Sequence, residues 1–578
     1  MCGIAGISGR GNGGVADAMI NALHHRGPDS KGTACLRDIA VAASRLAIVD
    51  LAGGAQPIYN ETGELCIVFN GEIYNHRALR SILEQKGHRF STHSDTEVVL
   101  HLYEEYDAKC VQQLRGMFAF AITDGERLFL ARDRLGIKPL YYALLSDGKT
   151  FLFASEIKAI LAFPEFSPRV DMQALADSAV LGHPIGTSTF IAGVRTLAPG
   201  HTMSVTCNGH PSVGEPVRYY PVGIERRGTL DMLEAERALE DALDEAVRMH
   251  LDADVDVGVL LSGGIDSTLM ALLARTHHGA SIKTFTVADH ARHPDVVQAQ
   301  FVATKIESVH RSIVPSFDEY LAAVPAHIAA EESPAELTAL PMFLLSRRIA
   351  GALKVCLNGE GADELFGGYR EYLDRPHKMS TLKRRVEVAL RAGIRPSPQV
   401  ELVMENLRSP PSYEAYLDAI FDFNLADRLE RYHLNGVDKL AMAAGVEMRV
   451  PYLDDNLVSL VRGFPARVLV DPDLGIGKYL LKRLCIRKFG PEYLPIVLRR
   501  KLGLPSAGAR HMEKLDKLCN EMLPSDYLSK HEFGRYFESK LRLLVFEMFV
   551  DIFTKHRGNP APVGTVEDFI GARAGAKI

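Results

Sequence analysis

The sequence predicts an α/β protein with two domains, and three differences in pattern along the chain support this prediction. Residues 2–205 consist of short β-rich runs, such as 118–122, separated by Gly, Asn, Asp and Pro. A buried-strand pattern at 255–261 is followed by a glycine-rich turn and a helical stretch at 267–275, an order typical of a parallel sheet covered by helices. Beyond about residue 380 the pattern is mostly helical. A chain of 578 residues can bury two cores, in domains of roughly 200 and 350 residues.

Individual elements follow from local composition. Strands of the first domain are expected at 65–69, 118–122 and 128–131. A helix is predicted over 95–105, where apolar residues recur at helical spacing. The second domain has a predicted helix over 230–249 and a further buried strand over 355–357. The segments are therefore a first domain at 2–207, a connector rich in Gly, Pro and Arg at 208–229, a second domain at 230–555 and a tail at 556–578.

Composition and charge exclude several classes of protein. The formal net charge is -6, with apolar residues at 47% and charged residues at 24%, as in an ordinary globular protein. The chain has no basic field that would bind nucleic acid or an anionic membrane, and no stretch approaches the roughly 20 apolar residues of a transmembrane helix. We therefore expect small-metabolite ligands, no nucleic-acid partner and no membrane association.

The eight cysteines form neither a zinc-binding pattern nor a disulfide framework, because no two of them stand at CxxC spacing. The chain begins Met-Cys-Gly-Ile and lacks the basic start and apolar stretch of a secretory signal. A reducing, cytoplasmic environment is therefore the expected location.

Cys2 is a candidate nucleophile because of its position. Removal of Met1 would leave a cysteine that carries both a thiol and a free α-amine. An amine with a pKa of about 8 can take the thiol proton and later return it to a leaving amine. A lone cysteine at the second position is more often a small buried apolar residue, so the interpretation depends on its surroundings.

Five sequence blocks place Cys2 in a recognisable context. They are CGIAG at 2–6, HRGPD at 25–29, SRLAIVD at 44–50, FNGEIYN at 69–75 and SDTE at 94–97. In this order they resemble the class II glutamine amidotransferase domain, an amino-terminal-nucleophile (Ntn) hydrolase with an αββα sandwich fold. The resemblance implies that Cys2 hydrolyses glutamine.

The same resemblance implies roles for five further residues. Asn70 and Gly71 would form the oxyanion hole, Arg45 would hold the carboxylate of glutamine, Asp95 its α-ammonium, and Glu72 would contribute to the pocket. Plainer interpretations exist for three of these features: a surface ion pair for the arginine, a helix N-cap for the aspartate and a hairpin turn for the Asn-Gly pair. Their joint occurrence in register with the nucleophile favours the catalytic interpretation.

The glycine-rich turn of the second domain has the character of an anion-binding loop. Its sequence, SGGIDS at 262–267, stands between a buried strand and a helix, where backbone N–H groups and the helix dipole favour a phosphate chain. A simple tight turn is the alternative. The hexamer resembles the PP-loop of ATP pyrophosphatases, which implies an adenine nucleotide α-hydrolase-like fold. ATP and pyrophosphate would contact Ser262, Gly263, Gly264, Asp266 and Ser267.

A Walker A loop fits the sequence less well. The nearest candidate, at 143–150, has alanine in place of the first glycine. We therefore expect AMP-forming chemistry and not simple transfer of the γ-phosphoryl group.

The block NGEGADELFGGY at 358–369 resembles the second signature of asparagine synthetases. This resemblance places Glu360 and Asp363 at an acyl-adenylate site. Asp266 and Asp363 would serve a Mg²⁺ ion that accompanies ATP, because Mg²⁺ prefers carboxylate oxygens and water. The alternative for the acidic pair is a solvated turn.

Two later blocks, at 438–454 and 478–482, are similar to the same family. Lys478 would stand near the acyl-adenylate and neutralise charge on adenylate and pyrophosphate. A solvated helix lysine is the alternative for this residue.

Together these resemblances imply a glutamine-dependent asparagine synthetase that uses glutamine, ATP with Mg²⁺, and aspartate as its carboxylate, with ammonia passing inside the protein to a β-aspartyl-adenylate. A homodimer is compatible with them. The segment 499–505 and Asn358 depart from the form typical of housekeeping asparagine synthetases. These departures leave open a relative that amidates another carboxylate in a specialised pathway. A non-catalytic regulatory homologue is the alternative from another class.

Overall fold

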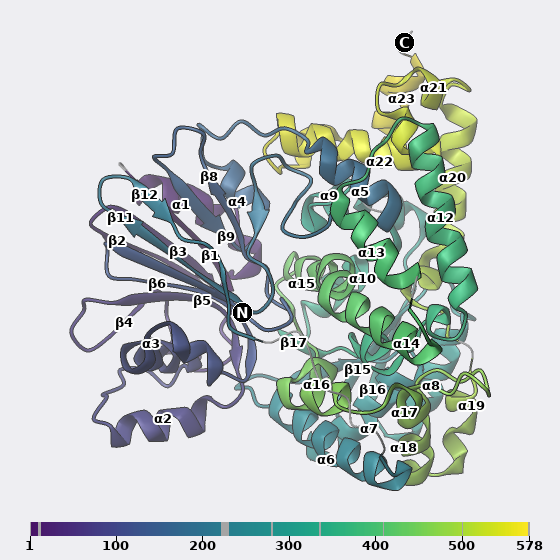
Figure 1. Cartoon of the computed structure of the whole chain (residues 1–578), viewed down its shortest axis with the longest axis horizontal. Helices are drawn as coiled ribbons and strands as arrows, with labels where there is room; N and C mark the ends of the chain where they lie inside the picture. Colours follow the sequence, from purple (N-terminus) through teal and green to yellow (C-terminus); the bar gives the residue numbers. More distant parts are fainter. Residues whose placement is uncertain are drawn as a thin grey trace.

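The structure is a computed structural model that describes residues 2–9, 13–220, 230–278, 281–334, 337–408, 410–499 and 501–575. Figure 1 shows two halves side by side. The start of the chain, in purple and blue, forms a β-rich half on the left, and the teal, green and yellow remainder forms a mostly helical half around a smaller sheet. The chain is therefore α/β overall, as the sequence predicts.

Two antiparallel sheets make up the β-rich half. The first has the order β10-β8-β9-β1-β3-β2, and the second has the order β12-β11-β7-β6-β5-β4 with β13 beside β11. Strands of the first sheet are β1 (Cys2–Ser8), β2 (Ser30–Leu36), β3 (Ile39–Arg45), β8 (Tyr141–Leu144), β9 (Phe151–Ala154) and β10 (Arg195–Thr196). Strands of the second sheet are β4 (Ile58–Tyr59), β5 (Cys66–Ile73), β6 (Gly116–Thr123), β7 (Arg127–Arg132), β11 (His201–Cys207), β12 (Pro211–Val213) and β13 (Val217–Arg218).

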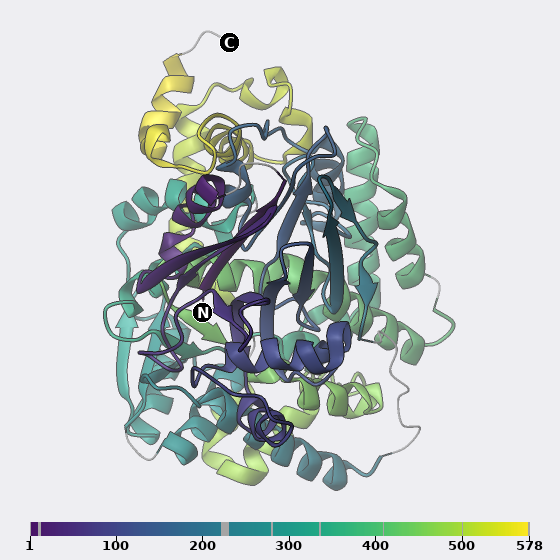
Figure 2. The ribbon, with the colours of Figure 1, turned by 90° about the vertical axis from the view of Figure 1, so that its left-hand side faces the viewer.

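The sheets stack face to face, and helices cover their outer faces. Figure 2 looks at this half and shows the strands of both sheets. Side chains such as Ile4, Val68 and Phe153 form the core between them, because alternate residues of each strand point inward. The covering helices are α1 (Gly13–Asn21) and α4 (Ile157–Leu161) on the first sheet, and α2 (His76–Gln85) and α3 (Asp95–Tyr106) on the second. The predicted αββα sandwich is confirmed.

The second half contains a five-stranded, wholly parallel sheet in the order β16-β15-β14-β17-β18. Its strands are β14 (Val257–Leu260), β15 (Lys283–Val287), β16 (Val309–Ile313), β17 (Val355–Leu357) and β18 (Glu447–Arg449). The chain runs from β14 outward to β16, then returns to the other side of β14 as β17. Ligands of open α/β sheets bind outside the carboxyl ends of the strands at such a switch point. The loops after β14 and β17 therefore define the expected site.

Helices cover both faces of this sheet and continue to the end of the described chain (Figure 1). On one face lie α6 (Met232–His250), α7 (Ile265–His278), α8 (Pro294–Lys305) and α18 (Tyr479–Phe489). On the other lie α10 (Leu340–Ile349) and α15 (Asn435–Met442). Later helices include α12 (Arg375–Arg391), α14 (Tyr413–Phe423), a π-helix (Asn424–Leu434), α20 (Ala509–Met522), α22 (Lys540–Val550) and α23 (Val566–Gly575). The predicted helical character beyond residue 380 is confirmed.

The region expected to be a connector, 208–229, is only partly described. Its first part contains β12 and β13, both of which pair with β11 and extend the second sheet. Residues 221–229 lie outside the described residues. The four segment boundaries stay a prediction.

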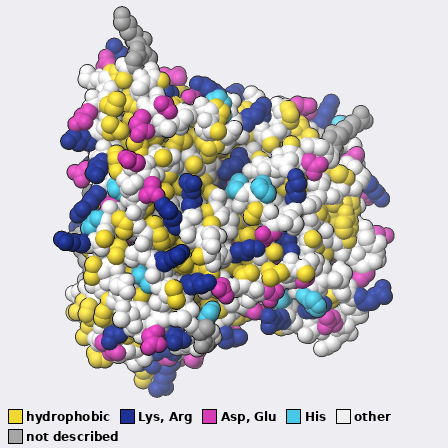
Figure 3. Space-filling view, turned by 180° about the vertical axis from the view of Figure 1, so that it is seen from behind, with side chains coloured by type: hydrophobic (Ala, Val, Ile, Leu, Met, Phe, Trp, Pro, Cys, Tyr) yellow, Lys and Arg dark blue, Asp and Glu magenta, His cyan; other side chains and the backbone are white. Residues whose placement is uncertain are grey.

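Side chains of both charges share the surface with apolar ones on the face shown in Figure 3. Among the helices within the described ranges, none has the length and apolar character needed to cross a membrane.

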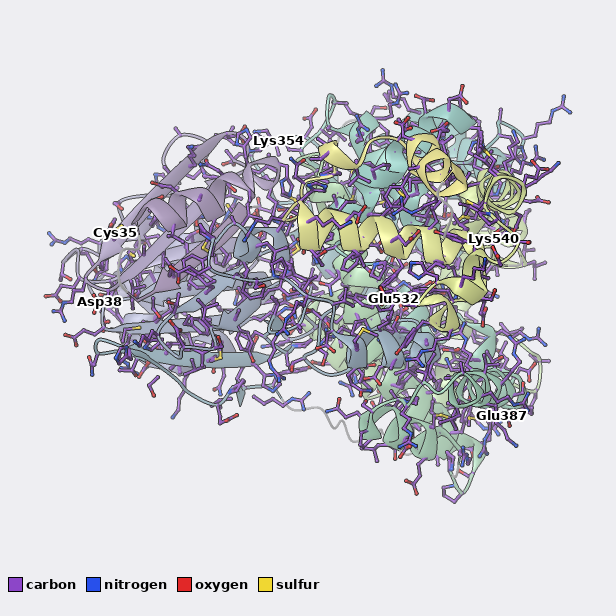
Figure 4. All side chains as sticks on the ribbon, turned by 90° about the horizontal axis from the view of Figure 1, so that it is seen from above. Cys35, Asp38, Lys354, Glu387, Glu532 and Lys540 are labelled. Atoms are coloured by element: carbon purple, nitrogen blue, oxygen red, sulfur yellow. The ribbon has the colours of Figure 1, made fainter. Side chains whose placement is uncertain are left out.

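Ion pairs join the two halves. Lys354, which directly precedes β17, places its Nζ 2.7 Å from Oδ2 of Asp29, and Figure 4 shows this lysine between the halves. Deeper in the junction, Nη2 of Arg115 lies 2.8 Å from Oδ1 of Asp454. The halves therefore meet through specific, partly buried contacts.

Candidate active sites

Cys2 opens the central strand β1 and is 4% exposed. In the antiparallel ladder it stands directly opposite Arg45 of β3, so the two side chains share one face. Its backbone N–H donates to Oδ1 of Asn70 at 3.2 Å, and Nε2 of Gln56 donates to its Sγ at 3.4 Å. Burial raises the pKa of the thiol, which Arg45 partly opposes. The thiol therefore accepts from a neutral amide, that of Gln56, and needs a base to ionise.

Asn70 has a free donor beside this thiol. Its side chain is fully buried in β5, and its Nδ2 has no hydrogen-bond partner among the described residues. A buried unpaired donor is costly, by about 1–3 kcal/mol, unless something binds it during function. Gly71 follows, and a Cβ there would lie 2.1 Å from the carbonyl oxygen of Met117. The Asn-Gly pair lies inside a strand, so the alternative of a hairpin turn does not apply.

Arg45 and Asp95 border the same space. Arg45 is 7% exposed, and its Nη2 donates to the carbonyl oxygen of Val49 at 3.0 Å, so it is not a surface ion-pair residue. Asp95 is the first residue of α3, and its Oδ2 accepts from the backbone N–H of Ile73 at 2.8 Å. Ser94, not Asp95, caps the helix. The backbone at Gly54 also lies close to Arg45, because a Cβ on Gly54 would lie 2.5 Å from Nη2 of Arg45.

Glu72 points toward the other half. Its Oε2 lies 3.2 Å from Nη2 of Arg449 in β18. Burial and the nearby Glu447 raise the pKa of the Glu72 carboxyl, and Arg449 opposes this shift. Glu72 thus connects the strand that carries Asn70 to the parallel sheet, and its predicted role in binding glutamine stays a prediction.

The loop 262–267 lies at the carboxyl end of β14. Gly263 has a φ of +68°, and a Cβ there would lie 2.5 Å from Cβ of Gln298 in α8, so only glycine fits. The hydroxyl of Ser267 lies 3.1 Å from that of Ser262, and it accepts a hydrogen bond from the backbone N–H of Ser262 at 3.2 Å. These hydroxyls hold the turn that leads into α7.

Two aspartates and two lysines form a charged cluster at the switch point. Nζ of Lys478 contacts Oδ2 of Asp266 and Oδ1 of Asp363, while Nζ of Lys501 contacts the other oxygen of Asp363. Burial lowers the pKa of the Lys478 ammonium, but the two aspartates outweigh it and raise the pKa above its usual range. Lys478 is 5% exposed and has a φ of +54°. The solvated-lysine alternative therefore does not fit its position.

Glu360 lies beside this cluster and contacts a histidine. Nδ1 of His433, in the π-helix, lies 3.2 Å from Oε1 of Glu360, and its Nε2 lies 3.4 Å from Oε1 of Glu364. Burial disfavours the charged ring, but Glu364 and Glu360 raise the pKa of His433 above its usual value. The hydroxyl of Tyr369 also meets this ring at 3.2 Å.

Family models match both halves of the chain. The glutamine amidotransferase domain matches residues 1–220, and asparagine synthase matches residues 238–552. This chain belongs to the asparagine synthetase family. Its first half is a glutamine amidotransferase domain, and the family is one of glutamine-hydrolysing ligases.

Individual relatives are similar along most of their length. "Asparagine synthetase [glutamine-hydrolyzing] 1" of Bacillus subtilis is 31% identical over 540 residues, covering 84% of this chain and 83% of that protein. "Asparagine synthetase [glutamine-hydrolyzing] 3" of Arabidopsis thaliana is 32% identical over 532 residues, covering 87% and 78%. A "Putative asparagine synthetase [glutamine-hydrolyzing]" of Mycobacterium bovis is 32% identical over 580 residues, covering 87% of each chain.

Sequence reasoning missed several residues of this asparagine synthetase family member. Arg26 is fully buried; its Nε donates to the carbonyl oxygen of Cys2 at 3.2 Å, and its Nη2 lies 2.7 Å from Oδ2 of Asp438 in the other half. Gln56, Lys501 and His433 were missed as well. The arginine and Asp438 lie in recognised blocks, so a search for buried charges there could have found them; the other three carry no local signal.

A Mg²⁺ ion fits the acidic pair of the synthetase site. Oδ1 of Asp266 is buried and has no hydrogen-bond partner within the described chain. Carboxylate oxygens are the ligands that Mg²⁺ prefers, and Asp363 shares Lys478 with Asp266. Asp266 and Asp363 are therefore the residues suited to hold Mg²⁺ with ATP, and the ion would neutralise phosphate charge.

Proposed function

We propose that the chain is a glutamine-dependent asparagine synthetase. It hydrolyses glutamine at Cys2 and transfers the ammonia to a β-aspartyl-adenylate made from aspartate and ATP, releasing asparagine, AMP and pyrophosphate. The observation that carries the proposal is the junction between the sites. Glu72, two residues from Asn70, pairs with Arg449, and β18 lies next to the strand that leads to Glu360. One buried framework thus supports both sites.

The first reaction uses the α-amine of Cys2 as its base. After removal of Met1, the amine takes the thiol proton, and Sγ attacks the side-chain amide carbon of glutamine. Nδ2 of Asn70 and the backbone of Gly71 stabilise the oxyanion, and the amine returns its proton to the departing ammonia. Arg45 holds the substrate carboxylate and Asp95 the α-ammonium. Water then releases glutamate from the thioester.

The second reaction forms and consumes an acyl-adenylate. A carboxylate oxygen of the acceptor attacks the α-phosphorus of ATP and pyrophosphate leaves. The loop 262–267 binds the phosphates, and Lys478 neutralises charge on them. Ammonia then attacks the acyl carbon, AMP leaves, and the ammonium group of the intermediate loses a proton, for which Glu360 is the acceptor in this proposal.

One observation favours a second candidate, in which the acceptor is a larger carboxylate. A cavity of about 300 Å³ lies between the halves and is lined by Lys378, Arg385, Arg428 and Arg542 with Glu371. Arg428 also lies over the ring of Tyr369 at 4.8 Å, and the hydroxyl of Tyr369 meets His433, the partner of Glu360, so these contacts connect the cavity wall to Glu360. An anionic acceptor body longer than aspartate would fit this basic lining.

The test measures pyrophosphate release with ATP, Mg²⁺ and glutamine, with aspartate and with a panel of longer dicarboxylates and amino acids. Cys2→Ala is assayed with glutamine and with ammonia. Asparagine formation by the wild type, retained by the variant only with ammonia, supports the proposal. Turnover with another acid but not with aspartate supports the second candidate. Silence across the panel contradicts both and favours a non-catalytic homologue.

A further inference from the structure

Four side chains of the amidotransferase domain converge at a place that neither reaction uses. They come from the loop after β4, the segment after α2 and one face of α3. They are Glu61, His88, His101 and Glu104, and one ligand atom of each lies within 4.8 Å of the others. His101 is fully buried, while the two glutamates border solvent. His101 stands six residues after Asp95, about 9 Å along α3 at 1.5 Å per residue.

The separations between these atoms match a four-coordinate metal site. Nδ1 of His101 lies 2.7 Å from Oε2 of Glu104 and 3.5 Å from Oε2 of Glu61. Nδ1 of His88 lies 3.3 Å from Oε1 of Glu61 and 3.8 Å from Oε2 of Glu104. Ligands at the usual Zn–N and Zn–O distances of about 2.0–2.1 Å stand about 3.3–3.4 Å apart in a tetrahedron. The four separations bracket this value, although Glu61 faces the two rings through different oxygens.

Outer carboxylates face the far nitrogen of each ring. Nε2 of His88 lies 3.2 Å from Oε1 of Glu105, and Nε2 of His101 lies 3.6 Å from Oε1 of Glu97. Histidines that ligate metals usually donate their other N–H to a carboxylate, a carbonyl or water, which fixes the tautomer and raises ligand basicity. His88 has that hydrogen bond, whereas Nε2 of His101 lies near Glu97 without a hydrogen bond in the described residues, and both rings direct Nδ1 at the four-residue cluster.

The arrangement suits one cation better than two neutral rings. A neutral imidazole has a single N–H, so a ring with carboxylates at both nitrogens leaves one nitrogen lone pair facing a carboxylate. In both rings this lone pair would face a carboxylate of the same four-residue cluster. Protonation of both rings would remove these conflicts with two separate charges, whereas a single divalent ion at the centre would remove them and neutralise the two inner carboxylates, Glu61 and Glu104, from one position.

We propose that Glu61, His88, His101 and Glu104 bind one divalent transition-metal ion of the zinc type. The ion has a structural role: it fastens the loop at residue 61 and the segment at residue 88 to α3. Glu97 extends this role, because it accepts hydrogen bonds from the backbone and hydroxyl groups of Ser91 and Thr92, just before Asp95. The metal thereby steadies the start of α3 beside the glutamine pocket.

The test uses untagged full-length protein stripped of metal with a chelator. Zn²⁺ is titrated against a chromogenic competing chelator, bound metal is counted by elemental analysis, and Co²⁺ is added as a spectroscopic probe. Variants are Glu104→Gln and His88→Gln, both near the surface, and Glu105→Gln for the outer carboxylate. The matched control is His277→Gln, which removes an imidazole whose Nε2 lies 3.0 Å from Asp244, far from the cluster in sequence. Circular dichroism checks the folding of every variant.

Wild type and His277→Gln are expected to bind one equivalent of Zn²⁺ and, with Co²⁺ in its place, to show the visible absorption bands of a four-coordinate ion. Glu104→Gln and His88→Gln should each bind Zn²⁺ at least about 10-fold more weakly, and Glu105→Gln about 10–100-fold more weakly. Absence of a tightly bound equivalent in the wild type, or equal binding by all four variants, would overturn the proposal and leave a network of histidine–glutamate ion pairs.

Discussion

The two candidate active sites differ in how they handle charge before any ligand binds. Around Cys2, the side-chain partners of the thiol and of the backbone N–H are neutral amides, Gln56 and Asn70, and one amide donor is left unpaired. Around Lys478, two lysines already neutralise Asp266 and Asp363. The Cys2 site thus holds an amide donor without a hydrogen-bond partner, whereas the Lys478 site holds a set of ion pairs that balance one another.

This difference follows from the chemistry proposed for each site. A thiolate that attacks a neutral amide creates a single oxyanion, which one or two oriented donors can stabilise. A triphosphate brings several negative charges at once, so cationic side chains must be available and must not repel each other beforehand. The comparison leads to opposite expectations for variants in the two halves.

Removing Lys478 should have the largest effect in the synthetase half. Lys478→Met is expected to lower amide formation by about 10³-fold with either glutamine or ammonia, because charge on the adenylate and pyrophosphate loses its partner. Glutamine hydrolysis without ATP should stay within about twofold. Lys488→Met is the matched control, since this lysine of α18, the helix that Lys478 directly precedes, pairs with Glu240 at 2.7 Å. Equal losses in both variants would contradict the assignment of Lys478.

Removing the unpaired donor should act on the other half alone. Asn70→Ala is expected to lower glutamine hydrolysis by about 10²–10³-fold, the usual loss for one oxyanion donor. Ammonia-dependent amide formation should be unchanged. Steady-state assays with the two nitrogen sources make the comparison. A parallel fall with ammonia would mean that Asn70 supports the whole fold and not the oxyanion.

The junction can be weakened at Asp438, which reaches the Cys2 site only through Arg26. Asp438→Asn removes the charge that pairs with Arg26 and with Lys138, whose Nζ lies 3.1 Å away. The free energy of unfolding in urea should fall by about 3 kcal/mol, because buried Lys138 loses its ion-pair partner and Arg26 keeps only Glu156. Asp422→Asn is the control, because its surface pair with Arg462 should contribute less than about 1 kcal/mol. Similar values for the two variants would show that the buried pair does not join the halves.

The smallest expected effect is a pH dependence at the end of α6. Burial lowers the pKa of His250 to about 4, against an ordinary value of 6.5. The unfolded state therefore binds a proton that the folded state refuses, and stability is lost as pH falls from about 6.5 toward 4. Between pH 7 and pH 5 this residue should destabilise the fold by about 2 kcal/mol. His250→Gln should reduce that loss in urea unfolding, and an unchanged pH dependence would contradict the prediction.

Local patterns were sufficient for much of the architecture. The apolar run at 255–261 and the glycine-rich turn after it predicted β14, the anion-binding loop and α7, because strand, turn and helix are consecutive in the chain. The five blocks around Cys2 likewise predicted the αββα sandwich through their resemblance to a family. The position of Cys2 was not sufficient by itself, because a lone second-position cysteine is more often a small buried apolar residue, and the blocks around it decided the interpretation.

Contacts between distant segments were decided by tertiary packing. Asp363 meets Lys478 and Lys501 only because α18 and the segment after it pack against the carboxyl ends of the parallel strands. His433 reaches Glu360 through a π-helix that no local pattern predicted. The physical reason is the same in each case: side-chain chemistry is encoded locally, but ion pairs and ligand sets depend on which surfaces are buried together.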